Sequence, residues 1–421
     1  MQKSALRNHL LTEHLTKVRT ACLLAPMTPS VARSTDPIRV GIVGGGFMAR
    51  VHTGAARAAG AQVVGLASSS LDSARSAAAR LSIPLAHDDL AALLDHKLDV
   101  VHVCTPNGTH ADYAQQVIDA GVNVVCEKPL AVDVMSARRL AVSAAASGLV
   151  ATVPFVYRFH PMAREARALV REGRIGELLT LQGSYLQDWL LAQGDDNWRV
   201  DEKAGGRSRA FSDVGSHLCD LLEFISGDRI AALHARTRTV HSTRGGREVR
   251  TEDLAVVMFE TTGGALGTLT VSQMAPGRKN RLWIELSGTQ RSLAFDQEQP
   301  ESLWVGERDG GRLLLRDPDV LSPDAARLAV TPAGHPQGYQ DAFNGFVSDT
   351  YAALRGHAPA GLPTFQDGLR ATEITEAVLL SAQTSEWVRL EAANDAESSF
   401  TQGTPSSEVS TGALAPNTRR Y

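Results

Sequence analysis

The sequence predicts an α/β protein of two domains, the first with a parallel sheet and the second with a large, mostly antiparallel open sheet. At 421 residues the chain is too long for one ordinary hydrophobic core. Between Ile38 and about Pro154, short β-branched runs alternate with alanine-rich helical stretches, which is typical of parallel sheets covered by helices. Beyond Ile175, strand-like runs follow one another with only turns between them, which indicates an antiparallel sheet.

The same patterns place the individual elements. In the first domain the expected strands are 38–43, 61–67, 100–104, 123–126 and 149–153, and the expected helices are 47–59, 70–81, 109–120 and 133–147. In the second domain the expected strands are 177–186, 230–240, 253–260, 264–273, 281–288 and 291–296, followed by helices near 339–354 and 366–384.

The expected domains are therefore 38–155 and 156–392, with a tail on either side. Residues 1–37 show no sustained pattern, and we expect a disordered leader in which Met27 is an alternative start. Residues 393–421 are polar and rich in Ser and Thr, and we expect a disordered tail.

The composition excludes several classes of protein. A hydrophobic content of 43% and a charged content of 21% are those of a soluble globular protein, and the net charge of -4 argues against a general nucleic-acid binder. No apolar run approaches the roughly 18 residues that span a membrane. The 4 cysteines form no CxxC pair and no metal-ligand spacing, so we expect no metal site and a cytoplasmic location.

A glycine-rich turn follows the first expected strand. In VGIVGGGFMAR, Gly44, Gly46 and Ala49 form a GxGxxA pattern between that strand and an amphipathic helix. The glycines permit a tight turn and let the backbone approach a pyrophosphate, whose charge meets the helix N-terminus. Because a second strand follows at the right spacing, this predicts a Rossmann domain that binds a dinucleotide, with Phe47 and Met48 at the same turn.

The residues after the second strand bear on the choice of cofactor. An acid about twenty residues past the glycines would hold the ribose hydroxyls of NAD. The chain has Ser68, Ser69 and Ser70 there, and its first acid, Asp72, already lies inside the next helix. Serine hydroxyls together with Arg75 can accept a 2′-phosphate, so the sequence favours NADP over NAD.

Two further segments, CTPNGTH (104–110) and CEKPL (126–130), follow later strands of the parallel sheet. Ligands of open α/β sheets bind beyond the carboxyl ends of the strands, so both segments should face the cofactor. Lys128 would then place an ammonium beside the nicotinamide, where it can hold a substrate hydroxyl and stabilise negative charge on its oxygen. The alternative is a surface lysine in a turn.

A third group of residues lies in GGRSRAFSDVGSHLCDLLEF (205–224). On a helix, Asp213, His217 and Asp220 are four and three residues apart and project from one face. A histidine transfers protons near neutral pH, and a carboxylate one turn away can orient it or bind a substrate hydroxyl. The alternatives are a structural histidine and a metal site, but the sequence supplies no further cluster of ligands.

With GIVGGGFMA, TPNGTH, EKP and DVGSHLCD in this order and spacing, the chain resembles the Gfo/Idh/MocA family of oxidoreductases over about residues 38–390. The resemblance implies a Rossmann domain followed by an α/β domain whose open sheet often forms subunit contacts, so we expect a homodimer or homotetramer. It also implies NAD or NADP as cofactor and a sugar, polyol or related small molecule as substrate.

The resemblance implies roles for single residues as well. Lys128 matches the family's catalytic lysine, His217 its proton-transferring histidine and Asp213 its substrate-binding acid. Positions that match cofactor-lining residues are Thr105, Pro106, Asn107, His110 and Glu127, and positions expected at the nicotinamide or the substrate are Tyr157, Arg158, Trp198 and Arg199. The segment 184–189, SYLQDW, is similar to sugar dehydrogenases of the levoglucosan type, whereas the two basic residues in GGRSRAFSD depart from the family pattern.

These residues predict an NAD(P)-dependent dehydrogenase that moves a hydride between nicotinamide and a carbinol carbon of a sugar-like substrate. His217 would remove the hydroxyl proton and Lys128 would stabilise the oxygen. Two other classes share the fold and stay open: glycosidases that use bound NAD for transient oxidation, and non-catalytic regulators that sense a nucleotide.

Overall fold

The first half of the chain forms a six-stranded sheet in which every neighbouring pair is parallel. The structure is a computed structural model, and it describes residues 36–391. The strand order is β3-β2-β1-β4-β5-β6, with the crossover at β1 that is typical of a Rossmann fold. The strands are β1 (Arg39–Val43), β2 (Gln62–Ala67), β3 (Leu85–His87), β4 (Val100–Val103), β5 (Asn123–Cys126) and β6 (Ala151–Thr152).

Helices connect these strands. They are α2 (Phe47–Ala58), α3 (Leu71–Leu81), α4 (Leu90–Leu94), the 3-10 turn η1 (Asn107–Thr109), α5 (His110–Asp119) and α6 (Val134–Ser147). Ser70, Asp89 and Asp133 cap α3, α4 and α6 because each side chain accepts a backbone N–H three residues on. The sequence patterns missed β3 and α4, which are three and five residues long and too short to show a period.

The second half is built on a nine-stranded sheet in the order β16-β15-β14-β13-β7-β12-β11-β8-β17. Only the β7–β12 pair is parallel. The strands are β7 (Leu178–Leu186), β8 (Ile230–Arg238), β11 (Leu254–Thr261), β12 (Leu266–Ser272), β13 (Arg281–Gly288), β14 (Ser292–Asp296), β15 (Ser302–Glu307), β16 (Gly310–Leu315) and β17 (Val388–Arg389). A separate ribbon pairs β9 (Thr243–Arg244) with β10 (Arg247–Glu248). The predicted fold class is confirmed.

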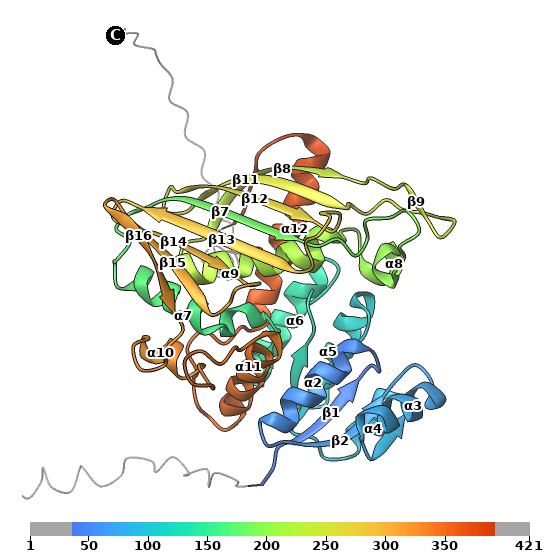
Figure 1. Cartoon of the computed structure of the whole chain (residues 1–421). Coiled ribbons are helices and arrows are strands. Elements are labelled where there is room, and N and C mark those ends of the chain that lie inside the picture. Colours follow the sequence, from blue (N-terminus) through green and yellow to red (C-terminus); the bar gives the residue numbers. More distant parts are fainter. Residues whose placement is uncertain (1–35, 392–421) are drawn as a thin grey trace, which may run out of the picture. The chain divides into compact units, whose positions relative to one another are not determined.

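One face of the nine-stranded sheet is buried against helices. Side chains alternate between buried and exposed along β11 and β12, and the buried set packs against α9 (Ser216–Ser226) and α12 (Phe365–Thr384). Figure 1 shows α9 beneath β7 and β13. The remaining elements are η2 (Val156–Phe159), α7 (Pro161–Arg171), η3 (Trp198–Val200), α8 (Glu202–Gly205), η4 (Phe211–Gly215), α10 (Pro323–Ala326) and α11 (Tyr339–Leu354).

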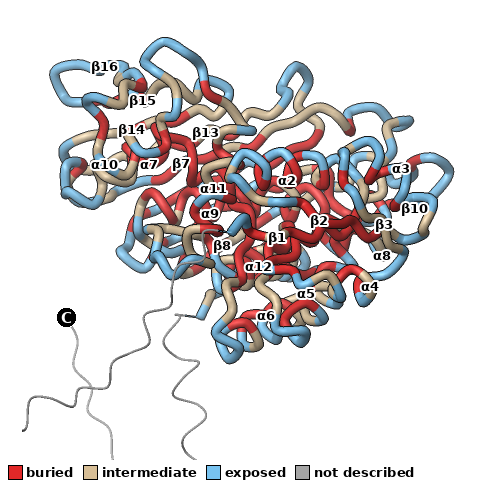
Figure 2. The backbone as a smooth tube through the Cα atoms, turned by 90° about the horizontal axis from the view of Figure 1, so that it is seen from below, coloured by how far each residue is buried: buried red, intermediate tan, exposed pale blue. Residues whose placement is uncertain are grey.

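The last two long helices return to the first half of the chain. Helix α11 packs on α2, and α12 packs on both α6 and β8. Phe343, Phe346 and Tyr351 of α11 belong to the same buried cluster as Val40 and Ile42 of β1. Figure 2 shows β1 and β2 within this buried interior. Helices from the end of the described chain therefore pack against the elements of the Rossmann sheet and of the nine-stranded sheet.

Among residues 36–391, no helix is both long enough and apolar enough to cross a bilayer. The expected disordered leader and tail fall almost wholly outside the described residues.

Candidate active site

The glycine turn between β1 and α2 leaves backbone groups open to a ligand. Gly44 has φ +106°, and a Cβ there would lie 2.5 Å from the carbonyl oxygen of Cys104, so only glycine fits. At Gly46, the N-cap of α2, a Cβ would meet nothing within 4 Å, and no side chain caps the helix. The first N–H groups of α2 are thus free for an anion, and the turn fits a pyrophosphate.

A cavity of about 510 Å³ opens at this turn. It is lined by nearly all the residues that the sequence predicts for cofactor binding, namely Gly44, Gly46, Phe47, Met48, Ser68, Ser69, Thr105, Pro106, Asn107, His110 and Glu127. Trp198 and Arg199 of the second half also line it. Arg75 does not: its side chain is exposed on α3 and outside the lining. This removes one of the two reasons for favouring NADP.

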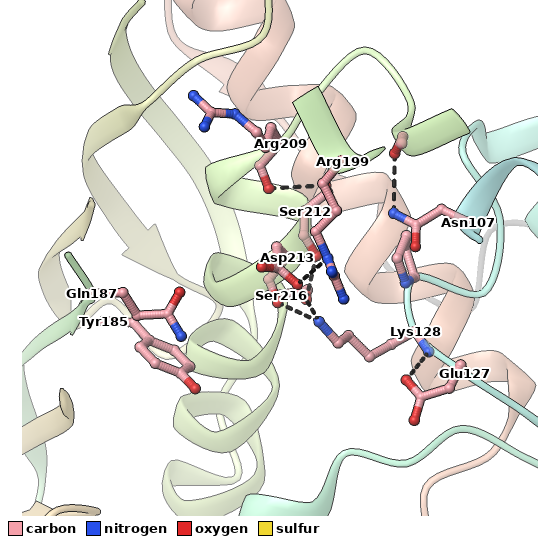
Figure 3. A network of polar contacts seen from close by, with 12 residues as sticks. Asn107, Glu127, Lys128, Tyr185, Gln187, Arg199, Arg209, Ser212, Asp213 and Ser216 are labelled. Carbon is pink, nitrogen blue, oxygen red and sulfur yellow. Dashed lines mark hydrogen bonds and ion pairs between the residues drawn. The ribbon is translucent and has the colours of Figure 1, made fainter. Parts of the chain in front are cut away.

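Polar contacts hold the turn after β4 in place. The His110 ring contacts the carbonyl oxygen of Pro129 through Nδ1 at 2.7 Å and that of Thr105 through Nε2 at 2.8 Å. Asn107 donates from Nδ2 to the carbonyl oxygen of Gly205 at 3.0 Å, which links η1 to α8 (Figure 3). His110 and Asn107 therefore shape the wall of the cavity.

Lys128 follows β5 and points at Asp213 (Figure 3). Its Nζ donates to Oδ1 and to the carbonyl oxygen of Asp213, both at 2.7 Å. Arg199 Nε lies 3.4 Å from the same Oδ1, and Gln273 donates to Oδ2 at 2.9 Å. Burial opposes ionisation of Asp213, but the charges of Lys128 and Arg199 outweigh it and hold its pKa well below the ordinary value. Asp213 is therefore an anion that fixes the lysine ammonium.

His217 lies on α9 and lines a second cavity, of about 350 Å³, together with Lys128 and Asp213. Burial and, next, the charge of Lys128 lower the pKa of His217 well below 6.5, with Asp213 opposing. The imidazole is therefore neutral at pH 7 and can accept a proton. Its ring packs edge-to-face on Tyr157 at 5.0 Å between centroids, and its buried Nδ1 has no hydrogen-bond partner within residues 36–391.

Hydroxyl and amide groups line the wall of this second cavity. The hydroxyls of Tyr157 and Tyr185 are 2.5 Å apart, and Tyr185 donates to Asn280 Oδ1 at 2.8 Å. Gln187 donates to the same Oδ1 at 2.8 Å, and Trp189 donates to Gln187 at 2.7 Å. Such a wall can exchange hydrogen bonds with a polyhydroxylated ligand.

The two cavities meet, because Phe47, Met48, Glu127, Lys128 and Arg199 line both. A ligand at the glycine turn and a second ligand beside His217 would therefore come together at Lys128. Lys128 and His217, to which the sequence assigns the stabilisation of the oxygen and the removal of the proton, both line the second cavity.

Glu127 stands at that junction at the end of a buried polar chain. Its Oε1 lies 3.0 Å from His52 Nε2, and its Oε2 accepts the backbone N–H of Lys128 at 3.0 Å. His52 contacts His102 at 2.8 Å, and His102 contacts the Tyr351 hydroxyl at 3.0 Å. Burial opposes ionisation of Glu127. The hydrogen bond and the electrostatic attraction from His52 outweigh burial and keep the pKa of Glu127 below its ordinary value.

Two predicted positions lie elsewhere. Arg158 donates from Nε to Oδ2 of Asp220 at 2.8 Å and from Nη2 to Asp367 at 2.7 Å, and it lines neither cavity. Asp220 does not line the cavity of Asp213 and His217, because Arg158 holds its carboxylate and both residues line a separate cavity. The prediction of one common face was wrong for Asp220, and Arg158 is not placed to touch a substrate.

Sequence reasoning also missed Gln273, Asn280 and Tyr339. Gln273 follows β12, Asn280 precedes β13 and Tyr339 begins α11, so only the fold brings them to the site. None lies in a motif with a recognisable spacing. Within residues 36–391 no group of three His, Cys, Asp or Glu side chains is arranged to hold a metal ion.

The chain is similar to known proteins over most of its length. Two family models match: the oxidoreductase family with an NAD-binding Rossmann fold at residues 38–155, and the GFO/IDH/MocA C-terminal domain at residues 163–294. The crystal structure of an oxidoreductase domain protein from Kribbella flavida is 33% identical with a TM-score of 0.80, over 85% of this chain and 100% of that one.

Two named relatives are similar along most of their length. The levoglucosan dehydrogenase of Pseudarthrobacter phenanthrenivorans is 28% identical over 387 residues, which are 83% of this chain and 97% of that enzyme. The inositol dehydrogenase homologue from Azotobacter vinelandii, solved with NADH and myo-inositol, is 27% identical with a TM-score of 0.78, over 85% of this chain and 99% of that one.

The Rossmann sheet, its glycine turn and the family match at residues 38–155 identify an oxidoreductase with an NAD-binding Rossmann fold. The chain belongs to the Gfo/Idh/MocA family of oxidoreductases.

Proposed function

We propose that the protein transfers a hydride between a nicotinamide cofactor and a carbinol carbon of a sugar, polyol or related cyclic molecule, with Lys128 and His217 acting on the hydroxyl. The observation that carries this proposal is the junction of the two cavities. A neutral imidazole and a fixed ammonium line the smaller cavity, which opens onto the glycine turn.

The bound nicotinamide supplies the hydride acceptor or donor. In the direction of oxidation, His217 takes the hydroxyl proton, because its pKa is low enough to leave it neutral. Lys128 donates a hydrogen bond to the same oxygen and stabilises its negative charge. Asp213 keeps the ammonium at that place and, as an anion, offers the substrate an acceptor.

A polyhydroxylated substrate suits the second cavity. Tyr157, Tyr185, Gln187 and Asn280 present hydroxyl and amide groups along one wall. Arg199 adds donors where the two cavities meet, and its guanidinium stacks at 4.4 Å on the ring of Trp198, which lines the larger cavity. The named relatives, one for levoglucosan and one solved with myo-inositol, support a cyclic polyol or anhydrosugar.

We further propose that both NAD and NADP serve as cofactor. Ser68 and Ser69 line the cavity at the end of β2, and no carboxylate there repels a 2′-phosphate. The predicted preference for NADP now depends on these two serines alone. The Azotobacter relative was solved with NADH, which supports the use of NAD.

We also propose a homodimer or homotetramer formed through the free face of the nine-stranded sheet. Val256, Met258, Leu266, Trp304 and Leu313 are large apolar side chains exposed on β11, β12, β15 and β16. Exposed apolar side chains gathered on one sheet face are typical of a subunit interface.

The test is a screen of the purified protein for cofactor reduction with a panel of sugars, anhydrosugars and cyclic polyols, with NAD and NADP in parallel. We expect turnover with at least one cyclic polyol or anhydrosugar. Hydrolysis of glycosides with nucleotide retained and no net reduction would indicate the glycosidase class instead. Nucleotide binding without turnover on the whole panel would indicate a sensing protein.

A further inference from the structure

A third cavity, of about 200 Å³, shares no lining residue with the two cavities of the active site. It lies among η2, α7, α9 and α12. Its charged lining comprises four arginines and three carboxylates, namely Arg158, Arg167, Arg229, Arg370, Asp220, Glu223 and Asp367. The lining thus carries an excess of positive charge.

The carboxylate oxygens of this cavity are already occupied. Both oxygens of Asp220 accept from Arg158. Asp367 accepts from Arg158 through one oxygen and from the N–H of Thr364 through the other, at 2.7 Å each. Glu223 accepts from Arg370 at 2.8 Å. The acids therefore offer little to a further cation.

The arginines, by contrast, have donors to spare. Arg167 and Arg229 make no side-chain hydrogen bond within residues 36–391, and Nη1 of Arg167 is buried without a partner. Burial and the positive charges of Arg171 and Arg158 lower the pKa of Arg167, with Asp324 opposing. The groups of this cavity that still lack a hydrogen-bond partner are arginine N–H donors. A ligand that pairs with them must therefore supply acceptors.

Three arginine side chains gather around the ring of Phe224. The guanidinium carbons of Arg158, Arg164 and Arg167 lie 4.9, 4.9 and 4.2 Å from the centre of its ring. Of these, Arg164 also has a buried Nη2 without a partner in the described part of the chain. Like charges held this close gain from a bound anion.

We propose that this cavity binds a small oxyanion: inorganic phosphate or the phosphoryl group of a phosphomonoester. The planar donor arrays of Arg167 and Arg229 match the tetrahedral array of acceptors on such an anion. The cavity is less than half the volume of the one at the glycine turn, so a dinucleotide does not fit. Arg158 adjoins Tyr157, and Asp220 is one turn from His217, so this anion site borders two elements of the active site.

The test is calorimetric titration of the protein with inorganic phosphate, in saturating NADH and at constant ionic strength. NADH blocks the glycine turn, where phosphate could also bind. Replacing an arginine by glutamine in Arg229→Gln or Arg167→Gln should weaken phosphate binding by about tenfold, the worth of one charge-assisted hydrogen bond. Arg139→Gln, which removes an exposed charge on α6 outside every cavity described, should change nothing.

A second arm uses methyl phosphate, which is too small to imitate a sugar. Binding as tight as that of inorganic phosphate indicates a phosphorylated metabolite, and much weaker binding indicates free phosphate; either result supports the site. The proposal is overturned if no phosphate binds at millimolar concentration, or if binding is the same in wild type and in the Arg167→Gln/Arg229→Gln double variant with an unchanged melting temperature.

Discussion

Single residues set the electrostatics of the candidate active site. Asp213 accepts from Lys128 and from Gln273 through different oxygens, which fixes the orientation of its carboxylate. The same carboxylate opposes the fall in the pKa of His217 that burial and Lys128 cause. One anion thus holds the ammonium in place and keeps the imidazole basic enough to take a proton.

The low pKa of His217 predicts the pH dependence of oxidation. A histidine whose pKa lies below 6.5 stays neutral, and so remains a base, as the pH falls to that value. We therefore expect the acidic limb of kcat/KM for sugar oxidation to lie below pH 6.5. The measurement is kcat/KM against pH with a saturating cofactor. A limb above pH 6.5 that disappears in a His217 variant would mean that the imidazole is charged in the free enzyme.

Ser69 tests the cofactor choice at the end of β2. Ser69→Asp places a carboxylate in the cavity where a 2′-phosphate would lie, so kcat/KM should shift towards NAD by about tenfold or more. Ser69→Asn, which has nearly the same shape and no charge, is the matched control. The comparison requires kcat/KM for both cofactors in all three proteins. A wild type that strongly prefers NAD and does not respond to the aspartate would show that the serines do not select the cofactor.

At the scale of elements, the contrast between Asp213 and Asp220 shows what spacing alone can predict. Helical spacing puts both on the side of His217, but Arg158 holds the carboxylate of Asp220, which lines a different cavity. Spacing along one helix does not reveal a partner such as Arg158, which comes from another element of the fold. The fold class and the long elements were predictable because hydrophobic periods extend over many residues, whereas Gln273 and Asn280 reach the site only through the tertiary fold.

The Arg158–Asp220 pair joins η2 to α9 and is buried. Asp220→Asn weakens this pair while Arg158 keeps its second partner, Asp367, so we expect a loss of about 1.5–3 kcal/mol in the free energy of unfolding, measured by urea denaturation. Arg158→Lys should also destabilise, because a lysine cannot bind the carboxylate with two donors. Arg250→Gln, which breaks an exposed pair with Glu248, should leave stability unchanged. Equal stability of all three variants and wild type would contradict a bracing role for the buried pair.

In the molecule as a whole, the two long helices at the end of the described chain pack against elements of both halves of the protein. Helix α11 adds Tyr351 to the polar chain that reaches Glu127, and α12 packs on both α6 and β8. The opposite face of the nine-stranded sheet carries exposed apolar side chains instead. The cytoplasmic location expected from the spacing of the cysteines stays a prediction.

We expect the exposed face of the nine-stranded sheet to form the interface between subunits. Met258→Asp together with Leu266→Asp places charges on the exposed sides of β11 and β12, where each would be buried in a subunit interface. We expect light scattering after gel filtration to show a dimer or tetramer for wild type and a smaller species for the double variant. The pair Val240→Asp and Val330→Asp, exposed apolar residues outside the strands of the sheet, is the control. A monomeric wild type would refute the proposed interface.

His217 is proposed to move the proton while the glycine turn holds the nucleotide, and a single comparison of variants separates these two roles. It compares kcat and the dissociation constant for NADH in wild type and in His217→Ala, with the substrate found in the screen. We expect kcat to fall by about 10²–10⁴-fold in His217→Ala, because a positioned general base contributes that much. We expect the dissociation constant for NADH to stay within about twofold of wild type, because His217 does not line the cavity at the glycine turn. Near-normal turnover of His217→Ala would contradict the assignment.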